Sequence, residues 1–325
     1  MAAKIQHYDR DAEDLGNIVM LEHVNLQVPD QAGATAFYIS GLGLTRDPYM
    51  NTGLANMWVN VGKSQFHLPT GDPWVLRGAI GLVVPDRDAL LKRLDGVGKT
   101  FVGTKFKVSA NNDYVEVTCP WGNKFNMHSP DEKRFGAISL GMPYLEFDVP
   151  MGTAKGIAKF YRKIFGALTS VEGKGEGRVA HVGVGYHQEL RFRQKKDVQK
   201  PYDGHHIQVY VQNFSAPYHE LVKREVLTEE SNAYQYRFEH IVDVDTNETL
   251  FEIEHEIRSM THPLYARPLV NRNPMQSQQS YQMDGDDWVW ETRRLNPRLP
   301  GVPAIDTPRA QALKERRGAR MARAM

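Results

Sequence analysis

Alternating apolar and polar positions recur in four stretches of this chain, and each stretch is followed by a helical pattern and further strand-like runs. In residues 21–28 the two kinds of residue alternate as they do in a half-buried strand. Similar first strands are predicted at residues 80–84, from Tyr144 onward and at residues 206–211. The pattern therefore predicts four units, each with the order strand, helix, strands.

Each unit is also predicted to contain one helix and to end in a β-hairpin. In the first unit the helix ends at Gly41 and Gly43. Gly62-Lys63 between two β-rich runs is a hairpin signal. The remaining helices are expected at residues 86–94, 154–165 and 218–226, and the hairpins at residues 56–68, 114–127, 178–193 and 238–257.

A Phe-Tyr pair with a glycine five residues later occurs twice, which indicates that the units are copies of one supersecondary structure. Each copy follows a strand-like run that ends in Val-Pro. The copies are Phe37-Tyr38 with Gly43 after Val28-Pro29, and Phe160-Tyr161 with Gly166 after Val149-Pro150. Equivalent positions can therefore be compared within one sequence.

Four βαβββ units in series resemble the vicinal oxygen chelate superfamily, which includes glyoxalase I, methylmalonyl-CoA epimerase, fosfomycin-resistance proteins and extradiol ring-cleaving dioxygenases. The resemblance covers residues 18–257. It is carried by the Val-Pro strand ends, the two Phe-Tyr helices and the Pro-Trp-Gly-Asn hairpin that begins at Pro120. It implies an α+β fold in which four βαβββ modules form two pseudo-symmetric half-barrel sheets. Such a scaffold hosts many reactions, so the fold alone does not select one.

The modules are expected to form two domains, followed by an extended C-terminal arm. The predicted segments are residues 18–128 for the first domain (modules 18–76 and 77–128), residues 129–142 for a linker, residues 143–260 for the second domain (modules 143–197 and 204–260) and residues 261–325 for the C-terminal extension. Beyond residue 261 prolines are frequent and no period is sustained, which is typical of an arm that wraps a globule. Trp288 and Trp290 favour packing of this arm on a surface.

The resemblance implies a divalent metal inside a pair of modules, with one ligand from the first strand and one from the last strand of each. The residues at these positions differ in kind, because those of modules one and four can bind a metal and those of modules two and three cannot. Modules one and four carry His23, His67, His206 and Glu254. Modules two and three carry Ala79, Asn126, Tyr144 and Arg191.

The chain resembles glyoxalases that have four modules in one chain. This resemblance implies that module one pairs with module four and module two with module three. The three histidines and Glu254 then meet in one cavity, whereas pairing of neighbouring modules would leave two ligand-type residues in each cavity. Three imidazoles and a carboxylate suit Zn, Fe, Ni, Co or Mn. We therefore predict one divalent metal per chain and a second cavity without metal.

Glu254 is predicted to be both a metal ligand and the base that transfers the substrate's proton, as the resemblance to glyoxalase implies. Glu252 is the alternative, because a spacing of two residues puts both carboxylates on the same side of the strand. His205 adjoins His206 and should face the opposite side.

Other polar residues are predicted to face the two cavities or to have a structural role. Candidates for hydrogen bonds, either to a substrate or within the protein, are Asn25, Gln27 and Gln208. The charged residues expected to form an ion-pair network in the metal-free pair, or to bind an anionic ligand there, are Glu146, Glu189, Arg191 and Arg193. The histidines predicted to be structural are His128, His240 and His255.

The predicted function is that of a glyoxalase-like lyase or isomerase acting on a small oxygen-chelating substrate, because a metal that holds two substrate oxygens stabilises an enolate at the neighbouring carbon. The first alternative is an extradiol-type dioxygenase, with His23, His206 and Glu254 as its 2-His-1-carboxylate triad. His67 as a fourth ligand, and Tyr144 where such enzymes carry a histidine, weaken that alternative. The second alternative is a non-catalytic protein that binds a small molecule.

Composition narrows the functional classes. The 325 residues are 41% hydrophobic and 24% charged, with a formal net charge of +1. This balance is typical of a globular protein and gives no electrostatic case for nucleic acid or an acidic membrane as partner.

Because the chain has a single cysteine, Cys119, an internal disulfide is excluded. No stretch resembles a signal peptide or a membrane span, so a cytoplasmic monomer or homodimer is expected, with a solvated basic tail at residues 309–323.

Overall fold

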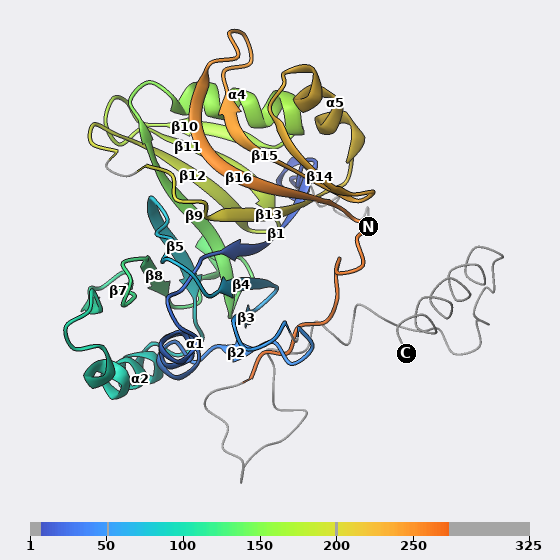
Figure 1. The fold of residues 1–325 in the computed structure, drawn as a ribbon. Helices are drawn as coiled ribbons and strands as arrows, with labels where there is room; N and C mark the ends of the chain where they lie inside the picture. The colour runs from blue at the N-terminus through green and yellow to red at the C-terminus, as the bar shows by residue number, and fades with distance from the viewer. Residues whose placement is uncertain (1–7, 51, 199–200, 273–325) are drawn as a thin grey trace, which may run out of the picture. The chain divides into compact units, whose positions relative to one another are not determined.

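The computed structural model describes residues 8–50, 52–198 and 201–272, and these form two mixed sheets of eight strands each (Figure 1). They lie within one compact unit, Met1–Trp290. One sheet combines the first and fourth modules and the other combines the second and third. We call them the 1/4 sheet and the 2/3 sheet. The predicted α+β class with four modules is thereby confirmed.

The 1/4 sheet joins its two modules at its centre, where β1 and β13 pair antiparallel. Within each module the first strand pairs parallel with the last strand. In spatial order the strands are β14 (Leu227–Asn232), β15 (Gln235–Val242), β16 (Thr249–Ser259), β13 (His206–Val211), β1 (Ile18–Asn25), β4 (Ser64–Pro69), β3 (Asn56–Val61) and β2 (Thr45–Arg46).

The 2/3 sheet repeats this plan, with β5 and β9 as its antiparallel central pair. Its first and last strands again pair parallel within each module. In spatial order the strands are β10 (Thr169–Glu172), β11 (Val179–Gly185), β12 (Gln188–Lys195), β9 (Gly141–Pro150), β5 (Gly78–Val83), β8 (Lys124–His128), β7 (Val115–Thr118) and β6 (Lys107–Ala110).

Amphipathic helices cover the sheets, and none of the described helices is long and apolar enough to cross a membrane. In α4 the apolar residues Ile157, Phe160 and Ile164 recur at helical spacing and are buried, and Gly166 (φ 61°) ends the helix in the left-handed conformation. The helical segments are α1 (Gln31–Ala34), continued by the π-helix η2 (Thr35–Gly41), α2 (Arg87–Gly98), α3 (Glu132–Phe135), α4 (Ala154–Phe165) and α5 (Ser215–Lys223), with the short turns η1 (Asp11–Glu13) and η3 (Lys99–Phe101).

The repeated Phe-Tyr pairs anchor helices in the core between consecutive modules. Phe37 and Tyr38 of module one contact Phe125 of module two, with ring centroids 5.5 Å and 6.0 Å apart. In the same way Phe160 of module three contacts Phe238 of module four at 5.8 Å. Consecutive modules therefore share a core, while the 1/4 sheet joins the two modules farthest apart in the sequence.

The helix predicted at residues 154–165 and the strand predicted at residues 206–211 have the observed bounds. The sequence pattern does not predict the outermost strand of each module. These strands are short or largely exposed and therefore lack an alternation of apolar and polar residues. They are β2, β6, β10 and β14.

The predicted linker at residues 129–142 contains α3 and the first residues of β9. Pro143 lies inside β9 without ending it, because the register between β9 and β5 shifts between Gly141 and Tyr144 and so accommodates a residue without an N–H donor. Each sheet takes four strands from each predicted domain. The division of the chain into those two domains stays a prediction.

Residues 260–272 lead from the end of β16 back to module one, and we call them the C-terminal strap. Arg267 of the strap forms an ion pair with the buried Asp47 at 2.5 Å. The Asn271 side chain accepts a hydrogen bond from the Gly62 N–H at 3.0 Å and donates one to its carbonyl at 2.9 Å. The rest of the predicted extension, including its two tryptophans and its basic tail, lies outside the described residues.

Candidate metal centre

The central strands of the 1/4 sheet bring three histidines together. β1 and β13 are antiparallel with Asn25 opposite His206, and β4 is parallel to β1 with His67 opposite Asn25. The ring centroid of His23 is 5.8 Å from that of His206 and 6.0 Å from that of His67. One ligand-type nitrogen from each ring lies within 4.8 Å of the other two. The three histidines predicted from the sequence therefore converge.

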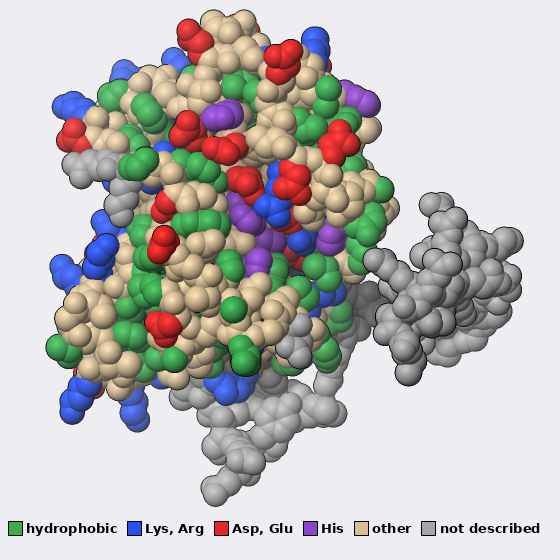
Figure 2. All heavy atoms as spheres, in the orientation of Figure 1, with side chains coloured by type: hydrophobic (Ala, Val, Ile, Leu, Met, Phe, Trp, Pro, Cys, Tyr) green, Lys and Arg blue, Asp and Glu red, His purple; other side chains and the backbone are tan. Residues whose placement is uncertain are grey.

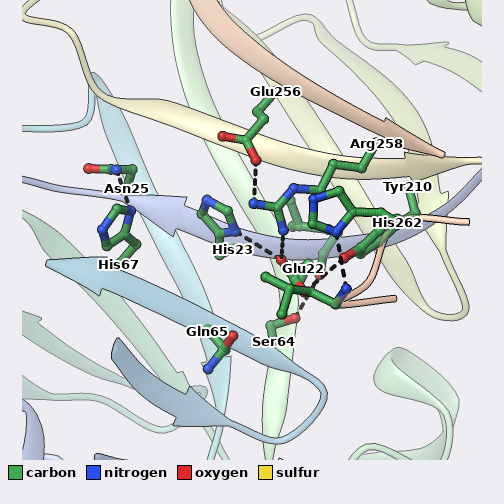
Figure 3. Close-up of polar contacts among 12 residues, drawn as sticks. Glu22, His23, Asn25, Ser64, Gln65, His67, Tyr210, Glu256, Arg258 and His262 are labelled. Atoms are coloured by element: carbon green, nitrogen blue, oxygen red, sulfur yellow. Dashed lines mark hydrogen bonds and ion pairs between the residues drawn. The ribbon is translucent and has the colours of Figure 1, made fainter. Parts of the chain in front are cut away.

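Each of these rings has a polar neighbour at Nδ1, as Figure 3 shows for His23 and His67. Metal-binding histidines usually hold their second ring nitrogen in this way, which fixes the ring and its tautomer. The pairs are His23 with Glu22 Oε2 at 3.0 Å, His67 with the Asn25 amide at 2.6 Å, and His206 with Glu254 Oε1 at 3.5 Å. In the structure the Asn25 Nδ2 atom faces Nδ1 of His67. Turning the amide by 180° lets its oxygen accept the Nδ1–H of His67 and leaves a lone pair on Nε2.

The Nε2 atoms of His23, His67 and His206 are all buried and have no hydrogen-bond partner among the described residues. Leaving a buried polar atom unpaired costs roughly 1–3 kcal/mol, so three such atoms in one group call for a partner. The Trp58 ring stacks on His67 with centroids 4.1 Å apart, which holds this imidazole in place. The arrangement fits a metal ion bound by three imidazoles.

A bulge in β1 places Glu22 beside His23. The ladder with β13 shifts between Leu21 and His23, so Glu22 is an extra residue whose carboxylate reaches the same side as the His23 ring. Glu22 also accepts hydrogen bonds from the Tyr210 hydroxyl at 3.1 Å and from Arg258 at 3.0 Å (Figure 3). Burial raises the pKa of Glu22, and the positive charge of Arg258 opposes this shift.

Burial keeps the three imidazoles neutral. It lowers the pKa of His67 to about 4, with a smaller contribution from the charges of Arg258 and Arg237. The pKa values of His23 and His206 are well below the usual value for the same main reason. Neutral imidazole is the form that binds a metal, so the histidines are ready to act as ligands near neutral pH.

The strand register identifies the module-four counterpart of His67. In module one, His67 lies opposite Asn25, two residues after His23. In module four, the residue two positions after the first-strand histidine is Gln208, and it lies opposite Glu256. Glu256 is therefore the equivalent position, and the distance from its Oε2 to Nε2 of His206 is 3.8 Å.

Glu254 lies two residues earlier, opposite His206 itself, and approaches its Nδ1 atom. It also forms an ion pair with Arg237. The sequence assigns both the ligand and the base role to Glu254, whereas the ladder places Glu256 on the Nε2 side. Whether Glu254 binds metal stays a prediction. Its rival Glu252 lies opposite His240, farther along the strand.

The other residues predicted near the site differ in their positions. Gln208 is fully buried and neither its Oε1 nor its Nε2 has a hydrogen-bond partner among the described residues. Asn25 contacts His67 as described above. Gln27 lies beyond the end of β1, with its side-chain amide against Gly71. His205, expected to face away, contacts Asp203 at 2.6 Å.

Sequence reasoning missed three contributors to this site: Glu22, Glu256 and Arg237. Glu256 shares the spacing of two that linked Glu252 with Glu254, and this spacing was the one signal available for it. Glu22 reaches the site only through the bulge. Nothing in the sequence pattern marks that bulge.

The corresponding face of the 2/3 sheet carries ion pairs. Arg193 donates two hydrogen bonds to Glu146, at 2.9 Å and 2.7 Å. Arg191 pairs with Glu189 and lies 3.7 Å over the Tyr144 ring. Of the two alternatives predicted from the sequence, the structure shows the ion-pair network. Within the described parts of the chain, the three histidines of the 1/4 sheet form the one group with metal-ligand geometry.

The histidines predicted to be structural lie outside the candidate metal centre. His255 is buried on β16 and contacts the Tyr161 hydroxyl at 2.6 Å. His128 is buried at the end of β8 and contacts the Tyr144 hydroxyl at 2.9 Å.

Comparison with solved structures identifies the fold. Glyoxalase I from Zea mays is 11% identical to this chain, with a TM-score of 0.52 over 74% of this chain and 92% of the other. A point variant of the same enzyme gives 12% identity, a TM-score of 0.52 and the same coverage. A catechol 2,3-dioxygenase aligns with 14% identity over 75% of this chain and 93% of the other, at a TM-score of 0.28.

The chain therefore has the fold of the vicinal oxygen chelate superfamily, with a buried three-histidine group in the sheet formed by its first and fourth modules. No family model matches the sequence, and no curated protein matches it.

Proposed function

We propose that His23, His67 and His206 bind one divalent metal ion through their Nε2 atoms, with Glu256 as the fourth ligand. The observation that carries this proposal is the compact group of three buried nitrogens without partners among the described residues. Imidazole suits Zn, Fe, Ni, Co and Mn, and a carboxylate completes a mixed nitrogen and oxygen site. Glu256 is preferred because it is the register equivalent of His67 and faces Nε2 of His206.

The proposed activity is that of a glyoxalase-like lyase or isomerase for a small substrate with two neighbouring oxygens. A bound divalent ion supplies Lewis-acid stabilisation of the negative charge that develops on those oxygens. Gln208 orients the substrate, since its buried amide offers both a donor and an acceptor without a partner in the described chain. The similarity of fold to glyoxalase I supports the reaction class and leaves the substrate open.

Glu254 is proposed as the group that moves the substrate proton. Its side chain is 26% exposed, so solvent and a small molecule can reach it, while Glu256 is 3% exposed. Burial raises the pKa of Glu254, and the charge of Arg237 opposes that shift. A carboxylate with a raised pKa is a better acceptor for a carbon-bound proton. The two roles predicted for Glu254 are thus divided between Glu256 and Glu254.

Two experiments test these proposals. Elemental analysis of protein purified without chelator should find about one divalent metal per chain, lost in the His23→Ala, His67→Ala double variant. Incubation of the metal-loaded protein in D₂O with small 2-hydroxy and 2-oxo carbonyl compounds should exchange the proton at the carbon next to the oxygens. Metal content unchanged in the double variant would refute the site. Oxygen uptake with a catechol would instead support the dioxygenase, and metal-free protein that binds small ligands would support a non-catalytic binder.

A further inference from the structure

Arg237 on β15 joins the two carboxylates beside His206. Its Nη1 donates to Glu254 and its Nη2 donates to Glu256. Its Nε has no hydrogen-bond partner among the described residues, and the carboxylate of the exposed Glu229 is 3.8 Å away from it. The Arg237 side chain is 22% exposed, so it reaches from the buried carboxylate Glu256 to the solvent. Figure 2 shows histidine, acidic and basic side chains gathered together on this face.

The other two arginines of the site have partners away from the histidine Nε2 atoms. Arg258 donates to Gln235 and to Glu22, both at 3.0 Å, in addition to its contact with Glu256. Arg267 donates to Asp47 and to Gln65. These guanidinium groups keep partners whatever happens to Glu256. Among the described residues Arg237 has no such additional hydrogen-bonded partner, because both Glu254 and Glu256 flank His206.

Charge balance at the site changes when a metal binds. The carboxylates around the histidines that accept hydrogen bonds from arginines are Glu22, Asp47, Glu254 and Glu256. Glu229 also pairs with Arg237 but is exposed, so solvent screens its charge and it is left out of the count. The guanidinium groups paired with them are Arg237, Arg258 and Arg267. With neutral imidazoles this set carries one excess negative charge, and a divalent ion converts it to one excess positive charge. Buried charges need partners, so a ligand with one negative charge restores the balance.

We propose that Arg237 binds the anionic group of the substrate, and that the substrate is a small carboxylate able to chelate a metal through two neighbouring oxygens, as 2-hydroxy and 2-oxo carboxylates do. This inference rests on the proposed metal centre. If Glu256 Oε2 were to bind the metal, Nη2 of Arg237 would be free to donate to another acceptor, while Nη1 would still donate to Glu254. The planar guanidinium fork matches a carboxylate, and such charge-assisted hydrogen bonds are about twice as strong as neutral ones.

The test compares glycolate with glycolamide on Co²⁺-loaded protein. Both ligands offer the same hydroxyl and carbonyl oxygens, but only glycolate is anionic. Titrations followed by the visible absorption of the bound Co²⁺ give a dissociation constant for each. Arg237→Gln should weaken glycolate about 10-fold or more while glycolamide changes by less than about 2-fold, as expected for the loss of one charge-assisted pair.

Matched variants distinguish a failure of this inference from a failure of the proposed metal site. Arg193→Gln removes a guanidinium that pairs with Glu146 on the 2/3 sheet and should leave both dissociation constants unchanged. Arg237→Lys keeps a cation without the fork and should weaken glycolate relative to glycolamide by a smaller factor, which also provides the test if Arg237→Gln does not hold Co²⁺. An unchanged ratio in both Arg237 variants would overturn the inference. Absence of histidine-dependent Co²⁺ binding in the unaltered protein would instead refute the proposed function.

Discussion

His206 has a different carboxylate near each ring nitrogen. Glu254 approaches Nδ1 at 3.5 Å, where an outer partner orients a metal-binding imidazole. Glu256 approaches Nε2 at 3.8 Å, on the side where a metal would lie. The two residues face the same side of β16 because side chains in a strand repeat every two residues. Their roles are therefore distinguished by position along the ladder and not by residue type.

Substitution of the two carboxylates should separate metal binding from proton transfer. Glu256→Gln should weaken metal affinity by about 10–100-fold or more, because outer-shell losses alone reach this range. Glu254→Gln should change metal affinity by less and lower turnover about 10²-fold or more, the usual contribution of a positioned base. Metal titrations and proton exchange measure the two effects. The reverse result would restore Glu254 as the ligand.

His128 should make stability depend on pH. Its pKa is lowered to about 4, mainly by burial and then by the charge of Arg134, from an ordinary value of 6.5. The unfolded chain therefore takes up a proton near pH 6.5 and the folded chain only near pH 4. The stability contributed by neutral His128 is complete above pH 6.5 and is lost as the pH falls toward 4.

The variant His128→Gln should lose less stability on acidification than the unaltered protein, by roughly 1–2 kcal/mol between pH 6.5 and 4.5. Urea denaturation at several pH values measures this difference. His219→Gln is the control, because His219 is exposed on α5. An equal loss of stability in all three proteins would show that His128 does not titrate differently in the folded state.

Two connections between distant elements shape the metal centre. The hairpin between β11 and β12 reaches the bulge of β1, where the Gln188 amide accepts from the Leu21 N–H at 3.1 Å and donates to the Leu21 carbonyl at 3.0 Å. Gln188 of module three thus satisfies the backbone of Leu21. The next residue, Glu22, is the bulge residue and has no ladder partner in the described part of the chain. The C-terminal strap is the second connection and ends at module one.

Removal of the strap's ion pair should destabilise the protein. Asp47 is buried, and Arg267 is its one ion-pair partner among the described residues. Arg267→Ala leaves that carboxylate without a counter-ion, so the free energy of unfolding should fall by about 3 kcal/mol. Chemical denaturation measures the change. Arg272→Ala, at an exposed position of the same strap, should stay within about 0.5 kcal/mol. Equal effects of the two substitutions would contradict the assigned role.

At the scale of the whole molecule, the two sheets share one topology but differ in chemistry. The 1/4 sheet carries the three-histidine group, and the equivalent face of the 2/3 sheet is occupied by the Arg193–Glu146 and Arg191–Glu189 pairs. Duplicated modules can keep their packing while one pair loses its metal ligands, because the core residues and the inner-face residues lie on opposite sides of each strand. We therefore expect one metal site per chain.

Metal stoichiometry should therefore be about one and not two. Titration of the metal-free protein with a divalent ion, followed by calorimetry, should show a single tight site. Arg191→Ala on the 2/3 sheet should leave that site intact, whereas His67→Ala should weaken it strongly. Two equivalent sites, or loss of binding in Arg191→Ala alone, would contradict the assignment.

Much of the architecture could be predicted because burial patterns are local. The Phe-Tyr pair of α4 and the alternation in β13 follow from residues within one element, and both elements have the predicted bounds. The outer strand β10 could not be predicted, since its exposed residues show no alternation and it is held only by pairing with β11. The convergence of the histidines could be predicted once equivalent positions in the repeats were compared and the family resemblance supplied the ligand strands and the pairing of modules one and four.

The sequence by itself determined the four modules, because they depend on residue type and local spacing. Together with the positions that the family resemblance implies, it also indicated which two modules carry side chains of metal-ligand type. Only the tertiary structure decided that Glu256 and not Glu254 is the register equivalent of His67, and that Glu22 and Arg237 join the site. A shift of two residues keeps every side chain on the same face of a strand, so the pattern of apolar and polar residues cannot reveal such a shift. Register and bulges arise from pairing between distant strands, and the fold sets that pairing.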